Sequence, residues 1–262
     1  MAFRASQERN RGGRVNATRK VIVGAWLPLV LITIWALATA ATPSIYFPPL
    51  QQILVRFKEN WLFSRFSEDV VPSLTIFAAG YVLAVVSGIL LGLVLASLKT
   101  LERIVDPFLQ FMRALPSIAL VPIVLVFAGI GIESKIFVVA LGAVWPILLN
   151  TVDGIRSMEP ELKRTAKVYQ VPRHVYVSQV MLPAASPNIL AGARVSLAIA
   201  MVLMVGSELY AATSGVGHFI LQSQQSFAIV DMWTGILLLG ILGYLCTQIF
   251  TLIERKVLRW TR

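Results

Sequence analysis

Long stretches without a charged residue are the feature that most constrains how this chain of 262 residues can fold. Crossing a hydrocarbon core about 30 Å thick takes roughly 20 mostly apolar residues in a helix, because every backbone N–H and C=O must be bonded within the segment. Five stretches are free of charge and approach or exceed this length: Val21 to Ala41, Val70 to Leu98, Ala114 to Ile132, Ile136 to Val152 and Met232 to Ile253.

A sixth stretch, Asn188 to Ala212, contains only Arg194 and Glu208 as charges, and both lie toward its ends. None of the six runs alternates apolar and polar residues as a membrane strand does. Only 14% of the residues are charged, against about 25% in a soluble domain. The sequence therefore predicts an all-α polytopic membrane protein with six transmembrane helices.

The basic residues predict the direction of these helices, because cytoplasmic loops are rich in Lys and Arg. With the N-terminus inside, the inside receives most of them, and the outside keeps only Arg56, Lys58, Arg65 and Lys135. The net charge of +10 is thus mostly a signal of membrane orientation. Both termini are expected in the cytoplasm, and no nucleic-acid partner is expected.

The chain divides into residues 1–20, a basic cytoplasmic tail expected on the lipid surface, residues 21–255, the six-span domain, and residues 256–262, a basic cytoplasmic C-terminus. Ala38-Thr39-Ala40 resembles the cleavage site of a secretory signal. The apolar run before it is longer than the roughly 7–15 residues of a signal h-region, so an uncleaved first span is expected.

Two loops carry information about partners. The outside segment Thr42 to Asp69 is expected to form a turn followed by an amphipathic helix, which either rests on the outer leaflet or docks an external partner. The inside loop 156–187 is basic and is expected to form a helix from Glu159-Pro160-Glu161 to about Tyr169, then a second helix that ends at Leu182-Pro183. It is either a protein docking element or a surface helix pair.

Prolines and charges within the spans are candidates for the solute pathway. Pro116, Pro122 and Pro146 interrupt backbone bonding, which membranes tolerate where the backbone faces protein or a water-filled cavity, although kinks for packing are the alternative. Glu208 is a candidate for an external gate or subunit contact, or else an interfacial residue that reaches water.

Two intramembrane arginines are further candidates. Arg113 and Arg194 could attract an anionic solute, but a position near the cytoplasmic boundary favours snorkelling of their side chains to the headgroups.

The sequence contains no phosphate loop, no metal cluster and no plausible Ser-His-Asp set. It lacks a Gly-x-x-x-x-Gly-Lys-Ser/Thr phosphate loop and a His/Cys metal cluster, and its histidines are His174 and His218 alone. Its single cysteine, Cys246, lies in an apolar run. We therefore expect a non-catalytic chain that binds no cofactor or metal itself.

The inside loop also contains a spaced pattern, in which Arg164-Thr165-Ala166 is followed by Gln170, Val180 and Leu182-Pro183. This pattern resembles the cytoplasmic signature of ABC importer permeases: Glu-Ala-Ala, three residues, Gly, nine residues, an aliphatic residue, one residue, then Leu-Pro. Arg164, Thr165 and Gln170 depart from the signature, and Gln170 replaces the residue that accepts φ > 0 without cost. The resemblance implies that the residues coupling the chain to an ATPase are Lys163, Arg164, Thr165, Ala166, Gln170, Val180, Leu182 and Pro183.

The resemblance extends over nearly the whole chain, to the subgroup of nitrate, aliphatic sulfonate, taurine and bicarbonate permeases. Its landmarks here are Arg113 to Pro122, Gly129-Ile130-Gly131, Trp145 to Thr151, Gly206-Ser207-Glu208 and Ser214 to Gly217. It implies a type I ABC importer permease of the bacterial inner membrane, with a small, anionic solute. The pathway or gate residues would be Pro116, Pro122, Pro146, Ser207 and Glu208.

Such a permease implies several partners: two ABC ATPase subunits that bind ATP and Mg, an extracytoplasmic solute-binding protein, a second copy of the permease in a homodimer, and membrane lipids. Two other functions stay open on the residues alone. A secondary transporter or channel would also have six spans, but the chain shows no pair of corresponding interrupted halves. A membrane scaffold would explain the basic loop but not the proline-broken core.

Overall fold

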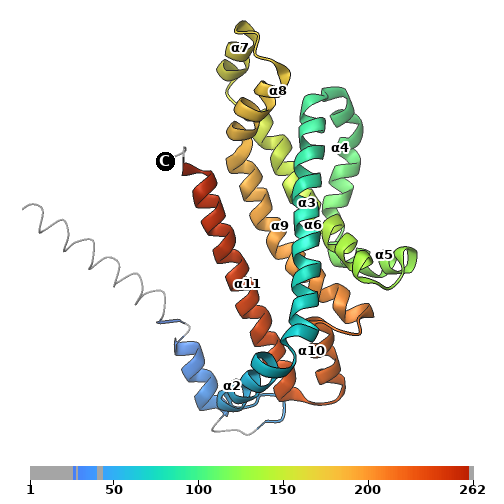
Figure 1. The fold of residues 1–262 in the computed structure, drawn as a ribbon, viewed down its shortest axis with the longest axis vertical. Coiled ribbons are helices and arrows are strands. Elements are labelled where there is room, and N and C mark those ends of the chain that lie inside the picture. Colours follow the sequence, from blue (N-terminus) through green and yellow to red (C-terminus); the bar gives the residue numbers. More distant parts are fainter. Residues whose placement is uncertain (1–25, 28, 40–43, 260–262) are drawn as a thin grey trace, which may run out of the picture.

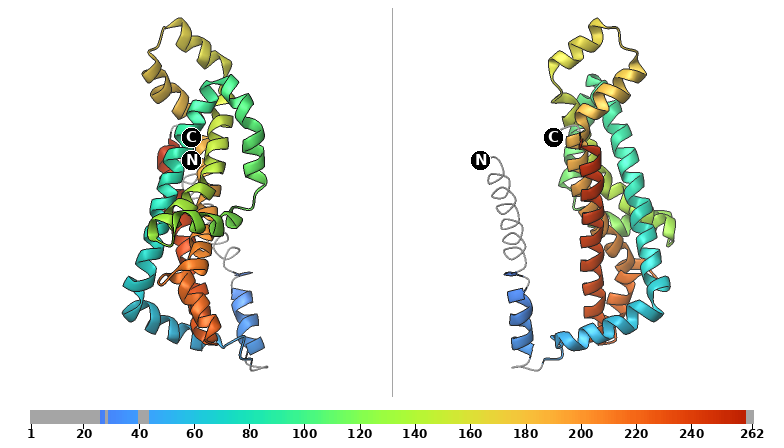
Figure 2. Two further views of the ribbon diagram at one scale, coloured as in Figure 1. Left: turned by 90° about the vertical axis from the view of Figure 1, so that its right-hand side faces the viewer. Right: turned by 60° about the vertical axis from the view of Figure 1, so that its left-hand side comes forward.

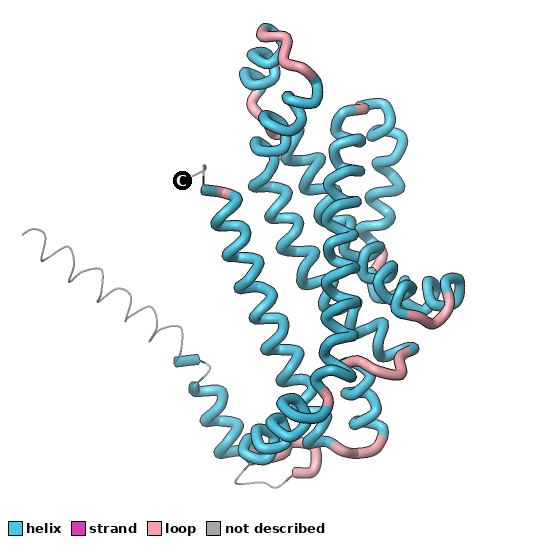
Figure 3. The backbone as a smooth tube through the Cα atoms, viewed as in Figure 1, coloured by secondary structure: helices cyan, strands magenta, loops and turns pink. Residues whose placement is uncertain are grey.

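The structure, a computed structural model, describes residues 26, 27, 29–39 and 44–259. Its regular elements in this part of the chain are all helical (Figure 3). The α-helices are α2 (Leu50–Lys58), α3 (Val71–Ser97), α4 (Lys99–Ala114), α5 (Leu120–Ala128), α6 (Ile132–Arg156), α7 (Pro160–Val168), α8 (Arg173–Val175), α9 (Leu182–Ala211), α10 (Val216–Gln225) and α11 (Ile229–Val257). A 3-10 turn, η3 (Ser117–Ala119), and three π-helical turns, η1 (Glu59–Ser64), η2 (Phe66–Val70) and η4 (Tyr176–Met181), connect them. The prediction of an all-α membrane protein is confirmed.

Within the described residues, 4 helices are long and apolar enough to cross a membrane, and they span Phe66–Ser97, Ile132–Arg156, Arg173–Tyr210 and Ile229–Val257. A fifth crossing is a bent pair, Arg103–Ala114 with Ser117–Ala128. Of the predicted first span, Val21 to Ala41, the structure describes residues 26 and 27 and the short apolar helix Leu29–Thr39. The other residues of this span lie outside the described part of the chain. The structure thus accounts for five of the six predicted spans.

The third span differs from its prediction. A continuous helix was expected over Ala114 to Ile132, but the chain already forms helix α4 from Lys99 and then turns by 88° before α5. Leu115 and Pro116 are extended at the turn, with ψ of 127° and 112°. Proline disfavours the helical conformation of the residue before it, so Leu115 cannot continue α4.

Small residues allow helices α3 and α6 to pack closely, and α6 packs in turn on α9. Gly80, Gly88 and Gly92 are buried on one face of α3 at spacings that are multiples of four residues. A Cβ atom added to Gly92 would lie 2.6 Å from the Cβ of Thr151 on α6, so no side chain fits there. Small residues four apart on one helix face are the spacing that permits such close helix approach.

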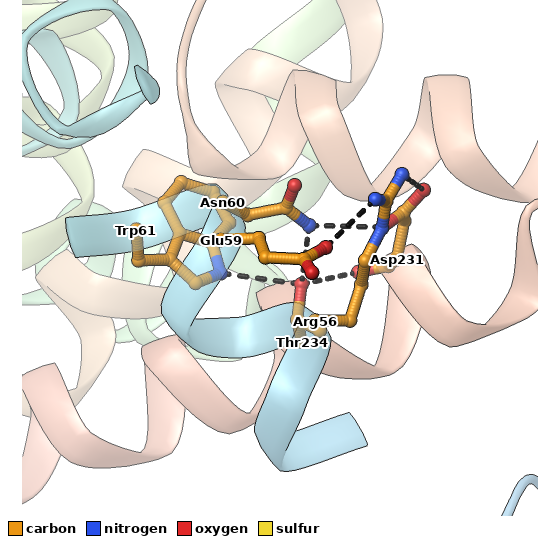
Figure 4. A network of polar contacts seen from close by, with 6 residues as sticks. All are labelled: Arg56, Glu59, Asn60, Trp61, Asp231 and Thr234. Carbon is orange, nitrogen blue, oxygen red and sulfur yellow. Dashed lines mark hydrogen bonds and ion pairs between the residues drawn. The ribbon is translucent and has the colours of Figure 1, made fainter. Parts of the chain in front are cut away.

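The end of the bundle occupied by α2 and α10 is closed by polar contacts between α2, η1 and α11 (Figure 4). Arg56 Nε donates to Asp231 Oδ1 at 2.7 Å, and Asn60 Nδ2 donates to the same oxygen at 2.9 Å. The indole N–H of buried Trp61 donates to Thr234 Oγ1 at 3.2 Å. Hydrogen bonds to Asp231 and Glu59 raise the pKa of Arg56 above its ordinary value. The predicted turn and amphipathic helix are therefore fixed to α11.

Helices α7 and α8 project at the opposite end of the bundle, beyond the turn that joins α3 to α4 (Figures 1 and 2). The long helices α3, α6, α9 and α11 run between these two ends. Residues 1–25 and 260–262, and with them the predicted basic tail, lie outside the described part of the chain.

We predict that Gly92→Val lowers the free energy of unfolding by about 1–3 kcal/mol, because overpacking forces α3 away from Thr151. The measurement is thermal unfolding of the purified chain in detergent. Gly240→Val in α11 is the matched control, because a Cβ at Gly240 meets nothing within 4 Å. Equal unfolding temperatures for the two variants would contradict the close approach of α3 and α6.

Candidate functional site

The break between α4 and α5 opens the middle of the bundle. Pro116 ends α4, whereas Pro122 lies in the first turn of α5, where a missing N–H costs no helical bond. Pro146 lies inside α6, which continues through it. The carbonyl of Pro146 accepts a hydrogen bond from Asn150 Nδ2 at 2.8 Å. The three predicted pathway prolines thus occupy three different structural settings.

A cavity of about 310 Å³ lies between the end of α4, the turn η3, α6 and α9. It brings Arg113 and Pro146 together, which the sequence suggested separately. Ser117, Asn150 and Asp153 also line it, and sequence reasoning did not select them as pathway residues. A signal was present, because Asn150 and Asp153 are three residues apart and so share a face of a helix.

Arg113 lies in the last turn of α4, and at 1.5 Å per residue it lies about 15 Å along the helix from Arg103. The helix that carries it begins at Lys99 rather than at Ala114, so Arg113 does not start the span. Its side chain is exposed. Snorkelling of Arg113 to the headgroups stays a prediction.

Arg194 has a partner within the chain. Its guanidinium forms an ion pair with Glu254 of α11 and lies 5.9 Å from the centre of the Phe250 ring. It borders a second, largely apolar cavity of about 760 Å³ between α9 and α11. The charge of Arg194 is thus balanced by Glu254, whereas Arg113 forms no ion pair with the residues that the structure describes.

Glu208 lies fully buried near the end of α9, with 0% of its surface exposed. Its Oε1 accepts a hydrogen bond from Ser73 Oγ at 2.6 Å, and its Oε2 accepts one from the Gly217 N–H at 2.8 Å. Buried Lys135 interacts with it electrostatically. Neighbouring Ser207 is equally buried and donates to the Met204 carbonyl at 2.8 Å.

The same network anchors the loop before α10. Asp69 Oδ1 accepts a hydrogen bond from the Gly215 N–H at 2.9 Å, and Ser73 Oγ accepts one from the Val216 N–H at 2.9 Å. The start of α3, the end of α9 and the start of α10 are therefore held together by one buried polar cluster, Asp69, Ser73 and Glu208. Sequence reasoning found only Glu208, because its partners are more than 130 residues away along the chain.

The projecting hairpin is built from α7, α8 and η4. Helix α7 begins at Pro160 after Glu159 and ends in a Schellman turn, in which the Val171 N–H bonds the Ala166 carbonyl at 3.0 Å and the Gln170 N–H bonds the Lys167 carbonyl at 3.1 Å. Gln170 adopts a left-handed φ of 49° there. The predicted first helix is confirmed, and the turn forms with glutamine in the position of the signature glycine.

Two parts of the predicted coupling set lie in different places. Lys163, Arg164, Thr165 and Gln170 are exposed near the tip, as are Val168 and Tyr169, each 78% exposed. By contrast, Val180, Leu182 and Pro183 are half-buried at the base, where Leu182 packs against a buried cluster that includes Met181 and Ile155.

The prediction that the second helix ends at Leu182-Pro183 is wrong. The turn η4 leads directly into α9, which contains Pro187 as well as Pro183. Proline at 187 provides no N–H for the Pro183 carbonyl four residues earlier. Ser186 Oγ donates to that carbonyl instead, at 2.8 Å, so the helix continues without an unsatisfied acceptor.

Comparison with known proteins identifies a family. Residues 88–260 match the family described as binding-protein-dependent transport system inner membrane component. A protein of Bacillus subtilis (strain 168) named as an aliphatic sulfonates transport permease is 34% identical over 239 residues, which cover 90% of this chain and 87% of that protein. A nitrate import permease of Synechocystis sp. is 28% identical over 246 residues, covering 91% of this chain and 90% of that protein.

A taurine transport system permease of Escherichia coli (strain K12) is 29% identical over 251 residues, covering 93% of this chain and 91% of that protein. Among solved structures, an inward-facing methionine ABC transporter matches with a TM-score of 0.61 and 22% identity, over 78% of this chain and 96% of the matched chain. The fold is thus that of an ABC importer permease.

We predict different outcomes for two replacements of Glu208. Glu208→Ala leaves the Gly217 N–H and Ser73 without their buried acceptor and should lower the free energy of unfolding by about 2–3 kcal/mol. Glu208→Gln keeps an acceptor for Gly217, and its amide can donate to Ser73, which then donates to the Asp69 carbonyl. It should therefore be clearly less destabilising, measured by thermal unfolding.

Solute uptake distinguishes two roles of Glu208, which are a hydrogen-bonded anchor of the polar cluster and a gate residue that needs its negative charge. If the hydrogen bonds alone matter, the Gln variant should transport much better than the Ala variant. Equal loss of uptake by two properly inserted variants would show that the negative charge itself is required. Glu133→Gln, an exposed carboxylate in the first turn of α6, is the control for charge removal.

Proposed function

Because the chain belongs to the family of inner-membrane components of binding-protein-dependent transport systems, we propose that it forms one half of the solute pathway of an ATP-driven importer. Members of this family are non-catalytic membrane subunits, and ATP is hydrolysed by partner ATPases. Family membership decides against a secondary transporter, a channel or a scaffold.

The observation that carries the coupling proposal is the exposed hairpin at one end of the bundle. Its tip presents the basic residues Lys163 and Arg164 beside the exposed side chains of Val168 and Tyr169. The Schellman turn fixes this tip, and η4 continues without interruption into the 30 residues of α9. A push on the hairpin would thus be transmitted along a continuous helix to the middle of the bundle.

We propose the following assembly around this chain: two ATPase subunits that bind ATP and Mg on the hairpin side, a second copy of the permease, an external solute-binding protein on the opposite side, and surrounding lipid. Helix α2 supports an outer docking surface, since its contacts with Asp231 fix it rigidly. Exposed Leu54 and Val55 lie on the same helix.

A small anionic solute is proposed from two observations. The relatives are named for sulfonates, nitrate, bicarbonate and taurine. In this chain, Arg113 places a positive charge on the cavity between α4, η3, α6 and α9. Pro116 supports the same location for the pathway, because the break after α4 forms part of that cavity's wall.

We predict that Ala166→Asp abolishes coupling, because it places a bulky negative charge in the last turn of α7, where the helix dipole is also unfavourable. Co-purification of the ATPase, uptake and solute-stimulated hydrolysis should all fall at least severalfold. Gln224→Asp, the same charge change on exposed α10 at the other end, is the control. Normal values of all three in an inserted Ala166→Asp protein would remove the hairpin as coupling element.

Gln170→Gly should be tolerated and should stabilise the hairpin by about 1 kcal/mol, because glycine adopts left-handed φ without the steric cost that other residues have. Protection of the α7 amide protons in hydrogen exchange should rise or stay equal, with uptake maintained. Faster exchange in the glycine variant would show that Gln170 makes contacts that outweigh the strain of its backbone.

We predict that both termini face the cytoplasm together with the hairpin. A reporter that is active only in the periplasm should give signal when inserted in 44–69 or near Gly217, and none at Val168 or after Arg262. The physical reason is that the inside loops hold most of the Lys and Arg residues. The reverse pattern would overturn the orientation.

A further inference from the structure

We infer that one face of helix α4 forms a wall of a water-filled vestibule on the hairpin side, and that the same face of a second copy of this chain closes the vestibule. This polar face consists of Arg103, Asp106, Gln110 and Arg113, which recur every three or four residues and are all exposed. The inference rests on the proposed import function and makes one of its partners specific, because it states which surface meets the second copy.

Helix α4 presents two further faces around its axis. The apolar face is also exposed, and it consists of Leu101, Ile104, Phe108 and Phe111. At 3.6 residues per turn, the polar and apolar faces point in roughly opposite directions. The third face lies between them and packs on the bundle through Leu109, which belongs to a buried cluster with Leu95 of α3 and Leu148 of α6. This chain therefore covers α4 on one side only.

The polar face runs beside the half of α6 that is nearest the hairpin. Leu148, which clusters with Leu109, lies about two turns before the end of α6 at Arg156. Just beyond the end of α4, the Cβ of Ser117 lies 3.2 Å from a Cβ placed on Gly142, in the middle of α6. Helix α4 thus follows α6 from near its end to its middle. The pair Arg103–Ala114 with Ser117–Ala128 is also apolar enough to form one membrane crossing.

In a membrane, acyl chains can cover the apolar face of α4 but not its polar face. Charged side chains are costly there unless they are paired or reach water. Gln110 Nε2 donates to Asp106 Oδ2 at 2.7 Å, but Arg103 and Arg113 form no ion pair with the described residues. The polar face therefore borders water. Because lipid lies on the opposite side of α4, this water must be enclosed by protein other than this chain.

A second copy fits the polar face by its charges. Arg103 and Asp106 are about 4.5 Å apart along the helix axis, a step that the long arginine side chain can span. A two-fold axis parallel to the helices places the α4 helices of two copies side by side, with equal residues at equal height. Arg103 of each copy then lies near Asp106 of the other. Opposite charges meet in both directions, as an isologous interface requires.

The cavity of about 310 Å³ continues the polar face toward the middle of the bundle. Arg113 lines this cavity together with the polar side chains of Ser117, Asn150 and Asp153. The cavity between α9 and α11 has mostly apolar walls and offers water no such route. The hydrated path thus leads from the hairpin side along α4 to the break at Pro116.

The test compares two thiols on opposite faces of α4, about 3 Å apart along its axis. Gln110→Cys lies on the polar face, and Phe108→Cys on the apolar face is the matched control. Both are made together with Cys246→Ser, which removes the single native cysteine. The full chain is assembled with its ATPase in lipid vesicles, and a charged, membrane-impermeant methanethiosulfonate is supplied on the hairpin side.

We expect Gln110→Cys to react at least about tenfold faster than Phe108→Cys, because the reacting thiolate and the charged reagent both need water. A bis-maleimide should join two copies through Gln110→Cys, giving a product of twice the mass of the chain, and should not join them through Phe108→Cys. Equal reaction rates, a Gln110→Cys thiol that joins no second copy, or joining through Phe108→Cys instead would each overturn the inference.

A charge exchange tests the contact between the copies. Arg103→Asp, added to Gln110→Cys, places like charges across the interface and should lower the yield of joined copies severalfold. Adding Asp106→Arg restores opposite charges and should restore the yield. A double exchange that joins no better than Arg103→Asp alone would overturn the pairing that identifies the second copy.

A parallel measurement separates this inference from the proposed function. ATP-dependent uptake by vesicles that contain the unmodified chain, supplied with the binding protein, tests the importer itself. Normal uptake with equal reaction rates at the two thiols would overturn only the vestibule at α4. Absence of ATP-dependent uptake in a correctly assembled complex would contradict the proposed function.

Discussion

The close contact between α3 and α6 is the interaction on which the rest of the bundle depends. Lipid supplies little hydrophobic drive between helices, so dispersion contacts at close range must hold them together. The small residues of α3 let its backbone approach Val139, Ile147 and Thr151 of α6. Because α6 also packs on α9, its orientation is fixed on both sides, and this fixed helix carries Pro146, Asn150 and Asp153 to the cavity.

Proline acts in two opposite ways in this framework, and local hydrogen bonding decides which. At Pro116 the preceding residue becomes extended and the helix breaks by 88°. At Pro187 the hydroxyl of Ser186 replaces the missing donor and α9 continues. The break creates a cavity in the middle of the bundle, and the continuity connects the hairpin with that cavity. The break beside the cavity and the continuity of α9 thus depend on the same condition, namely whether another group bonds the backbone that a proline leaves unsatisfied.

The sequence predicted what depends on local composition, namely the apolar spans, the first hairpin helix at Glu159 and the spacing to Gln170. It did not predict what depends on distant partners. Ser73 and Asp69 join Glu208 only after α3 and α9 have packed, and Glu254 reaches Arg194 across 60 residues. The start of helix α4 at Lys99 was missed because charged Arg103 and Asp106 interrupt the apolar pattern before Ala114.

The distribution of charge then separates structure from transport. Arg56, Arg194 and Glu208 each have partners, and each connects elements far apart in the sequence. Two of these pairs hold α11 at its two ends, Asp231 with Arg56 of α2 and Glu254 with Arg194 of α9. The largely apolar cavity between α9 and α11 lies along the same helix. Among the described residues, Arg113 and Asp153 form no ion pair, and their exposed side chains line the cavity between α4, α6 and α9. Charged groups of a membrane protein cost little where they reach water, so these two charges need no partner to offset them and do not hold helices together as Arg56, Arg194 and Glu208 do.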